Sequence, residues 1–549
     1  MKNLGESIGV AEIMLALVFS SVSTTTTTTP KHILLIVVDD LGSADLGYTG
    51  SQIRTPNIDG LRAQGVALDS FYVQRACSPT RAALLTGRYN IRYGFQSGVL
   101  TDRNNYSLPL DEATLPQYVR RAVPAAACHM VGKWHLGYHQ WENTPTFRGF
   151  DSFLGYYSGD EDYFTHVGDC GGFDLKLEDA PRCGPGCSRH YWEAQGNYST
   201  QLFTARAVSL IEAHDAATSL FLYLPYQAVH VPDQVPAAYM AGYDFPKVLG
   251  SNARNIFAGM LACLDEGVGN LTAALRRKSM LDETLVWLQT DNGAATPACG
   301  GWTGGMNWPL RGGKCTAWEG GLRGTAFISG AGIAAALRGT SAAAIVHSVD
   351  VLPTLVGALG GDAAALARRG FAAGPLDGVD QWPMLSRGAP GARDTVLLEA
   401  DPLSSPYSNK PPGFVCSGDQ HATPYYALRQ GRWKLLIGDP GADDNVHASI
   451  GNGWWCTGPP CPDDHNNTAA VAGPFGVDSV MLFDVVADAA ERTDVAAAHP
   501  DVVKRLTALI EALNATAVDS RGVCAPSDPA QAPSLHNGTC TPWLTGELA

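Results

Sequence analysis

The chain has 549 residues, of which 45% are hydrophobic and 17% are charged, as in ordinary globular proteins. This length predicts two or three domains, or one large α/β domain with an appendage. The net charge of −15 argues against a nucleic-acid binder, because neutralising phosphates requires a basic face and no Lys/Arg block is present. A small anionic substrate is compatible with this net charge, since a few cations can form a local positive pocket on an acidic protein.

The N-terminus resembles a secretory signal. Lys2 precedes a short apolar run at 13–19, which small residues follow. We expect a signal peptide at 1–23 and a disordered Thr-rich linker at 24–31. The run is too short to cross a bilayer and no other segment is long enough, so we expect no membrane span and a secreted or lysosome-like location.

Thirteen cysteines are an odd number, which in a secreted protein calls for one cysteine with a special role. Disulfides are expected among those in Gly/Pro/polar surroundings: Cys170, Cys183, Cys187, Cys416, Cys456, Cys461, Cys524 and Cys540. Cys128 and Cys263 lie in apolar segments and are expected to be free. A zinc site of Cys183, Cys187 and His190 is an alternative that lacks an evident fourth ligand. Six glycosylation sequons fit a secreted chain: Asn105, Asn197, Asn270, Asn466, Asn514 and Asn537.

Short apolar runs predict strands, and longer periodic segments predict helices. The expected strands of the first part of the chain are 32–38, 66–73, 128–131, 220–226, 284–290 and 325–329. The expected helices are 55–65, 112–120, 252–276 and one that starts near 348. This alternation predicts an α/β domain.

A further helix is expected to start at Cys77, in the stretch CSPTRAALLTGRY. Pro79 suits the first turn of a helix, and Ala82 to Leu85 are good helix formers. A helix N-terminus favours an anion or a nucleophile with a lowered pKa, and Arg81 adds a permanent positive charge one turn later. A buried structural cysteine is the alternative.

Polar residues follow one predicted strand after another: Asp39, Asp40, Lys133, His135, His230, Asp291 and Asn292. In an open α/β sheet, ligands bind at the carboxyl edge of the strands. These residues, spread over some 250 positions of the chain, are therefore expected to converge on one crevice.

The composition changes near 386–393, where we place a boundary between a catalytic domain at 32–390 and a C-terminal α+β subdomain at 391–549. Two alternating segments around Gln430-Gly431 predict a hairpin. A strand at 481–486 and an amphipathic helix at 501–514 complete the subdomain.

Taken together, the chain resembles the type I sulfatases over residues 32 to about 514, and is most similar to the arylsulfatase B, or N-acetylgalactosamine-4-sulfatase, group. The strings that carry the resemblance, besides CSPTR, are VVDDLG at 37–42, IRTPN at 53–57, LLTGRY at 84–89, MVGKWHLG at 130–137, FLYL at 221–224 with VH at 229–230, TDNG at 290–293 and NWPLRG at 307–312. This resemblance implies an alkaline-phosphatase-like α/β fold. In such a fold a large mixed, mostly parallel sheet is flanked by helices, and a smaller C-terminal α+β domain follows.

The resemblance implies four metal ligands, Asp39, Asp40, Asp291 and Asn292. Three carboxylates and an amide oxygen form a hard-cation set, which favours Ca²⁺, with Mg²⁺ less expected because it holds its waters more tightly. It also implies that a formylglycine-generating enzyme converts Cys77 to Cα-formylglycine, which acts as a geminal diol. The remaining implied roles are stabilisation of that hydrate by Arg81, sulfate binding by Lys133 and Lys314, and proton transfer by His135 and His230.

The implied function is hydrolysis of sulfate monoesters, either aryl sulfates or sulfated glycans. Two alternatives stay open. The same metal scaffold also supports phosphomonoester, phosphodiester and phosphonate hydrolysis, and an unconverted Cys77 would leave a sulfated-glycan-binding protein without turnover.

Overall fold

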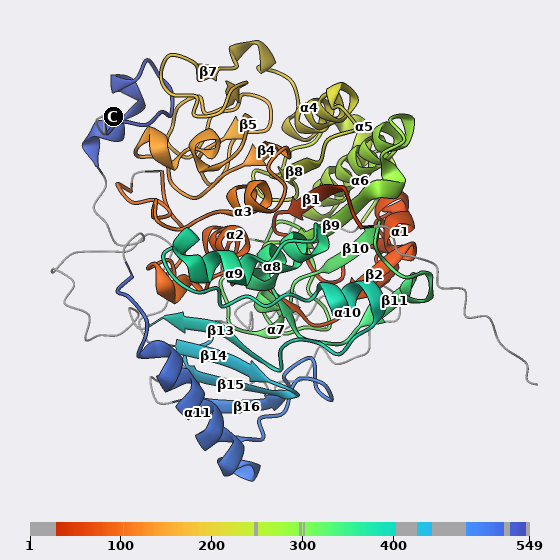
Figure 1. Ribbon diagram of the computed structural model, residues 1–549. Coiled ribbons are helices and arrows are strands. Elements are labelled where there is room, and N and C mark those ends of the chain that lie inside the picture. The colour runs from red at the N-terminus through yellow and green to blue at the C-terminus, as the bar shows by residue number, and fades with distance from the viewer. Residues whose placement is uncertain are drawn as a thin grey trace, which may run out of the picture.

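A large mixed sheet covered by helices and a smaller antiparallel sheet beside it make up the computed structural model (Figure 1). The structure describes residues 29–102, 104–245, 251–295, 299, 302–401, 425–441, 479–520 and 528–544. The predicted α/β fold class is confirmed. The predicted signal peptide and most of the Thr-rich linker lie outside the described residues.

The large sheet positions the site. Its strand order is β11 (Thr340–Ala342), β2 (Gly65–Leu68), β10 (Ala326–Gly330), β9 (Thr284–Thr290), β1 (His32–Val38), β8 (Leu220–Pro225), β4 (Ala127–Lys133), β5 (Ser152–Tyr156), β6 (Lys176–Glu178) and β7 (Arg189–His190). The five strands from β9 to β5 run parallel. Every residue of β1 is buried, which explains its unbroken apolar sequence, since helices cover both faces of a parallel sheet.

Two sets of helices cover the two faces. One face packs against α2 (Cys77–Thr86), α3 (Leu115–Ala122) and α8 (Ser348–Ala358). The other packs against α1 (Pro56–Ala63), α4 (Ser199–Ala213) and α6 (Ala253–Arg277). Short helices α5 (Ala237–Met240), α7 (Glu319–Leu322), α9 (Ala363–Leu366) and α10 (Trp382–Arg387) join these elements. Within the described ranges no single helix is long and apolar enough to span a membrane, and only the bent combination of α8 with 363–371 meets that test.

The small sheet is antiparallel, in the order β13 (Thr395–Asp401), β14 (Tyr425–Gln430), β15 (Trp433–Gly438) and β16 (Val480–Asp484), and α11 (Pro500–Asn514) packs on it. The predicted hairpin and helix are confirmed. Lys434 of β15 is fully buried and binds Glu319 of α7 at 3.0 Å and Glu491 at 2.8 Å, so buried ion pairs join the small sheet to α7.

One predicted strand is wrong in its extent. The segment 66–73 forms two elements: β2 in the large sheet, and β3 (Phe71–Tyr72), which pairs with β12 (Val346–His347) in a separate two-stranded sheet. A turn at Asp69-Ser70 separates them, and Asp69 N–H donates to the Ala342 carbonyl.

Three disulfides occur among the described residues: Cys170–Cys540, Cys183–Cys187 and Cys299–Cys315. The first two join cysteines expected to pair, whereas Cys299–Cys315 was not predicted. The Cys183–Cys187 bond overturns the zinc alternative, because it consumes both thiols. Cys128 and Cys263 are free and buried, as predicted. Cys416, Cys456, Cys461 and Cys524 lie outside the described residues.

Candidate active site

All ten predicted site residues lie at one edge of the large sheet. The ends of four neighbouring parallel strands, β9, β1, β8 and β4, supply most of them. Asp39 and Asp40 follow β1, Lys133 ends β4 and His135 comes two residues later, His230 lies in the turn after β8, and Asp291 and Asn292 follow β9. Cys77 and Arg81 come from α2, and Lys314 from the loop before α7.

Cys77 is the first residue of α2, as the sequence predicts. Its thiol donates to Asp39 Oδ1 at 3.3 Å and to Asn292 Oδ1 at 3.5 Å. Burial, followed by the nearby Asp39 carboxylate, raises the pKa of the Cys77 thiol. The expected lowering of this pKa is therefore wrong for the unmodified cysteine, because desolvation outweighs the helix N-terminus.

Thr80 supports the turn before Cys77. Its hydroxyl accepts a hydrogen bond from Gln74 N–H at 2.8 Å.

Buried cations surround the carboxylates. Arg81 binds Asp291 Oδ2 through Nε at 3.0 Å and Nη2 at 2.7 Å, and Nη2 also reaches Asp39 Oδ2 at 3.1 Å. Lys133 Nζ binds the same Asp39 oxygen. Despite the opposing effect of burial, Lys133 together with His230 and Arg81 holds the pKa of Asp39 well below its usual value. Burial and the Asp39 charge raise the pKa of Asp291.

Lys314 and Asn292 both contact the carboxylate of Asp40. Lys314 Nζ lies 2.7 Å from Asp40 Oδ1, and Asn292 Nδ2 donates to the same oxygen at 2.7 Å. His230 Nε2 lies 3.9 Å from Asp40 Oδ2, while His230 Nδ1 lies 2.8 Å from the Val231 carbonyl. The His230 side chain is 12% exposed, so it lies on the open side of the cluster.

His135 is buried with one nitrogen unused. Nε2 lies 2.9 Å from the Leu100 carbonyl, which assigns the ring proton to Nε2. Nδ1 is buried and has no hydrogen-bond partner. Burial, followed by Lys133 and Arg81, holds the pKa of His135 well below its usual value, so the neutral ring presents a bare acceptor nitrogen.

The donor set fits a hard divalent cation. Asp39, Asp40, Cys77 and His230 present ligand atoms that all lie within 4.8 Å of one another. Asn292 Oδ1 lies beside the Cys77 sulfur, and Asp291 Oδ1 lies 3.4 Å from Asp40 N. Oxygen atoms of carboxylates and an amide are the ligands that Ca²⁺ prefers.

Sequence reasoning missed a second pair of acids beside this cluster. Asp160 forms a side-chain hydrogen bond with Asp169, and both lie in the loop after β5. Burial and Asp169 raise the pKa of Asp160 to about 8, against the opposing charges of Lys133 and Lys314. These acids follow β5, so predicting that strand would have placed them at a strand end. The strand β5 was not predicted from the sequence.

Comparison with known proteins places this geometry in context. A family model described as Sulfatase matches residues 31–361. Arylsulfatase J of Mus musculus is 36% identical over 524 residues, which cover 93% of this chain and 80% of that protein. Arylsulfatase A of Bos taurus is 32% identical over 447 residues, covering 75% of this chain and 77% of that protein.

Among solved structures, the crystal structure of Ps i-CgsB in complex with k-i-k-neocarrahexaose has a TM-score of 0.69 at 23% identity. It covers 93% of this chain and 98% of that chain. At this identity the likeness shows a shared fold.

Proposed function

The chain belongs to the sulfatase family and is a sulfuric ester hydrolase, and we propose that its nucleophile is Cys77 after conversion to Cα-formylglycine, with Ca²⁺ held by Asp39, Asp40, Asp291 and Asn292. The observation that carries this proposal is the position of Cys77 at the start of α2, in contact with Asp39 and Asn292. Membership in the narrower arylsulfatase B group stays a prediction.

A bound cation would give the cluster a net positive charge. Three carboxylates, Asp39, Asp40 and Asp291, contact three permanent cations, Arg81, Lys133 and Lys314. These side chains balance one another, so a divalent cation would leave a positive surplus that attracts an anionic sulfate ester. The same cation would oppose burial and the Asp39 charge, which raise the pKa of Asp291.

Each side chain then has a role that its position supports. When present, the formylglycine hydrate supplies an activated oxygen and the cation polarises the sulfate group. Lys133 and Lys314 bind sulfate oxygens, and Arg81 fixes the carboxylates beside residue 77. The bare Nδ1 of His135 accepts a proton at residue 77, and His230, on the open side, orients the departing alcohol oxygen.

Burial of Cys77 bears on its maturation. The residue is 1% exposed, and α2 is covered by α3 and α8. A formylglycine-generating enzyme would therefore act on the chain before it folds. The disulfides support a route through an oxidising compartment, and hence a secreted or lysosome-like location.

The substrate class is a sulfate ester of an aryl alcohol or of a sugar. A sulfated glycan is supported by the structural neighbour whose crystal contains a neocarrahexaose. The alternative of phosphate or phosphonate hydrolysis uses the same kind of site, so the test must compare the two anions directly.

The test measures kcat/KM for an aryl sulfate and the matching aryl phosphate in parallel, with Cys77→Ala as the control for contaminating activity. We expect a preference for the sulfate, and none of this activity in the variant. A preference for phosphate would overturn the substrate assignment, and binding of sulfated polysaccharide without any release of sulfate would support the non-catalytic alternative.

The mass of the tryptic peptide Ala76–Arg81 tests the nucleophile. Active protein from its own host should carry an aldehyde at residue 77. An unmodified thiol in fully active protein would contradict the formylglycine mechanism.

Removal of the metal tests the cation. Chelation with EGTA should abolish turnover and lower the melting temperature, because the folded protein loses the free energy of binding the ion. Ca²⁺ should restore both quantities better than Mg²⁺. Full activity after exhaustive chelation would contradict a metal-dependent site.

A further inference from the structure

The last described segment of the chain returns to the large sheet. Residues 528–544, here called the strap, lie against the β5–β6 edge, far from the small sheet that precedes them in sequence (Figure 1). Phe173 N–H donates to the Gly538 carbonyl at 2.9 Å, and Cys540 N–H donates to the Phe173 carbonyl at 3.0 Å. The Cys170–Cys540 disulfide links the two segments covalently.

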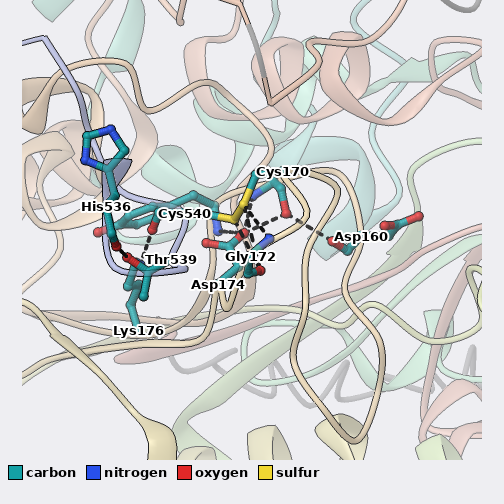
Figure 2. Close-up of a disulfide and its surroundings, with 10 residues drawn as sticks. Asp160, Cys170, Gly172, Asp174, Lys176, His536, Thr539 and Cys540 are labelled. Carbon is teal, nitrogen blue, oxygen red and sulfur yellow. Dashed lines mark hydrogen bonds between the residues drawn. A yellow bond between two sulfur atoms is a disulfide. The ribbon is translucent and has the colours of Figure 1, made fainter. Parts of the chain in front are cut away.

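A buried lysine reinforces this attachment. Lys176 is 1% exposed, and its ammonium group donates to the Cys540 carbonyl. Figure 2 shows the disulfide with Lys176 and Thr539 on one side and Asp160 on the other. The strap is therefore joined to the loop 157–174, which carries the acids Asp160 and Asp169.

The other end of the strap contacts the turn that carries His135. The backbone N–H groups of Trp543 and Leu544 donate to the His139 carbonyl at 3.2 and 2.9 Å. The Trp543 ring packs edge-on against Tyr138, with centroids 5.6 Å apart. One segment thus binds both the loop 157–174 and the turn 134–139.

These two regions meet beside the reacting residues. A Cβ placed on Gly159 would lie 2.6 Å from Asp169 Oδ2 and 3.1 Å from His135 Nε2. The loop backbone therefore fills the space between an acid and a predicted catalytic histidine. Burial and Asp169 raise the pKa of Asp160, and the charges of Lys133 and Lys314 oppose that change.

We propose that the strap is a positioning element of the substrate entrance: through the Cys170–Cys540 bond and the Trp543 contacts it holds the loop 157–174 against the His135 turn, and so determines how sulfated glycans, rather than small aryl sulfates, bind. This inference rests on the proposed sulfatase site. A small aryl ester reaches only the groups around Cys77, whereas the sugar rings of a glycan extend past them to the loop.

The test compares KM and kcat for two kinds of probe, an aryl sulfate and a panel of singly sulfated disaccharides, used as substrates or as competitors of aryl sulfate hydrolysis. The variant is Cys170→Ala/Cys540→Ala. The matched control is Cys183→Ala/Cys187→Ala, which removes another disulfide but leaves the strap contacts in place.

We expect the strap variant to raise KM or the inhibition constant of the disaccharides by about tenfold, while KM for the aryl sulfate stays unchanged and the control resembles the wild type. If the double variant does not fold, Trp543→Ala removes the ring contact with Tyr138 and loosens the other end of the strap. It should shift the ratio of disaccharide KM to aryl sulfate KM in the same direction. An equal change in KM for both kinds of probe, or no change for either, would overturn the inference. An inactive wild type would instead refute the proposed function.

Discussion

At the scale of single residues, Arg81 is the group on which the charge balance of the site depends. Its guanidinium contacts two buried carboxylates, Asp39 and Asp291, and also donates to the Lys133 carbonyl at 3.2 Å. A lysine has one ammonium group and cannot reproduce this forked set of contacts. The residue was identified from the sequence because it follows Cys77 by one helical turn.

Replacing Arg81 by lysine or methionine separates charge from geometry. Arg81→Lys should fold but lose roughly a hundredfold in kcat/KM, because the carboxylates are no longer held in place. Arg81→Met should lower the free energy of unfolding by about 3–5 kcal/mol, since it removes the cation paired with buried Asp291 and one of the two cations paired with buried Asp39. Urea denaturation and initial rates measure the two effects.

The control for both variants is Arg432→Lys, whose side chain is 53% exposed and pairs with Asp484 at the surface. It should change neither quantity by a measurable amount. Wild-type kinetics in Arg81→Lys would show that the forked contacts do not matter for turnover.

At the scale of elements, the sequence predicted the parts of the site that follow long apolar strands. The strand at 284–290 has the same bounds in the structure, and the one at 32–38 likewise, because an unbroken buried run is an unambiguous pattern. The residues directly after these strands could therefore be predicted to meet.

The helix α4 and the strand β5 were not predicted, for two different reasons. The helix α4 buries the polar side chains of Ser199, Thr200 and Thr204, so its apolar periodicity is weak. The strand β5 contains Gly155, whose Cβ would lie 1.9 Å from the Gly132 carbonyl oxygen of the next strand. A glycine is needed here because the backbones of β5 and β4 approach closely, and a single sequence does not reveal such an approach.

The helix α7, which follows the loop that carries Lys314, packs directly on the turn that carries the metal ligands Asp291 and Asn292. A Cβ on Gly293 would lie 1.7 Å from the Gly320 carbonyl oxygen. Gly293→Ala should therefore displace α7 and, with it, the preceding loop whose Lys314 binds Asp40. We expect kcat/KM to fall by about tenfold or more and the free energy of unfolding by about 1–3 kcal/mol.

Gly60→Ala is the matched control for this substitution. Gly60 lies inside α1, and a Cβ there would meet nothing within 4 Å. Alanine should stabilise that helix by roughly 0.5–1 kcal/mol without changing turnover. Unchanged kinetics in Gly293→Ala would show that the loop tolerates the displacement.

At the scale of the whole molecule, the small sheet supports the site from outside it. Glu399 and Asp401 of β13 bind Arg75, two residues before Cys77, and Lys434 of β15 binds Glu319, five residues after Lys314. Both contacts are buried and join segments separated by more than 100 residues. The sequence predicted the subdomain from its hairpin and helix, but partners this distant have no local pattern.

The buried Glu399 gives the molecule a pH-dependent stability that can be measured. Burial raises the pKa of Glu399 from 4.5 to about 7, although Arg75 opposes the change. The folded protein thus holds this proton more tightly than the unfolded chain does. Its contribution is complete below pH 4.5 and is lost as the pH rises through 7.

Glu399→Gln removes this titration and keeps the oxygen that accepts from Arg75 N–H. The variant should match the wild type near pH 4.5 and exceed its free energy of unfolding by up to roughly 3 kcal/mol at pH 8. Urea denaturation across this range measures the difference, with Glu511→Gln on the exposed face of α11 as the control. Parallel pH profiles for wild type and Glu399→Gln would mean that Glu399 binds its proton no more tightly in the folded protein. Because the comparison is between isosteric variants, titration of the buried histidines, which acts on both proteins alike, cancels from it.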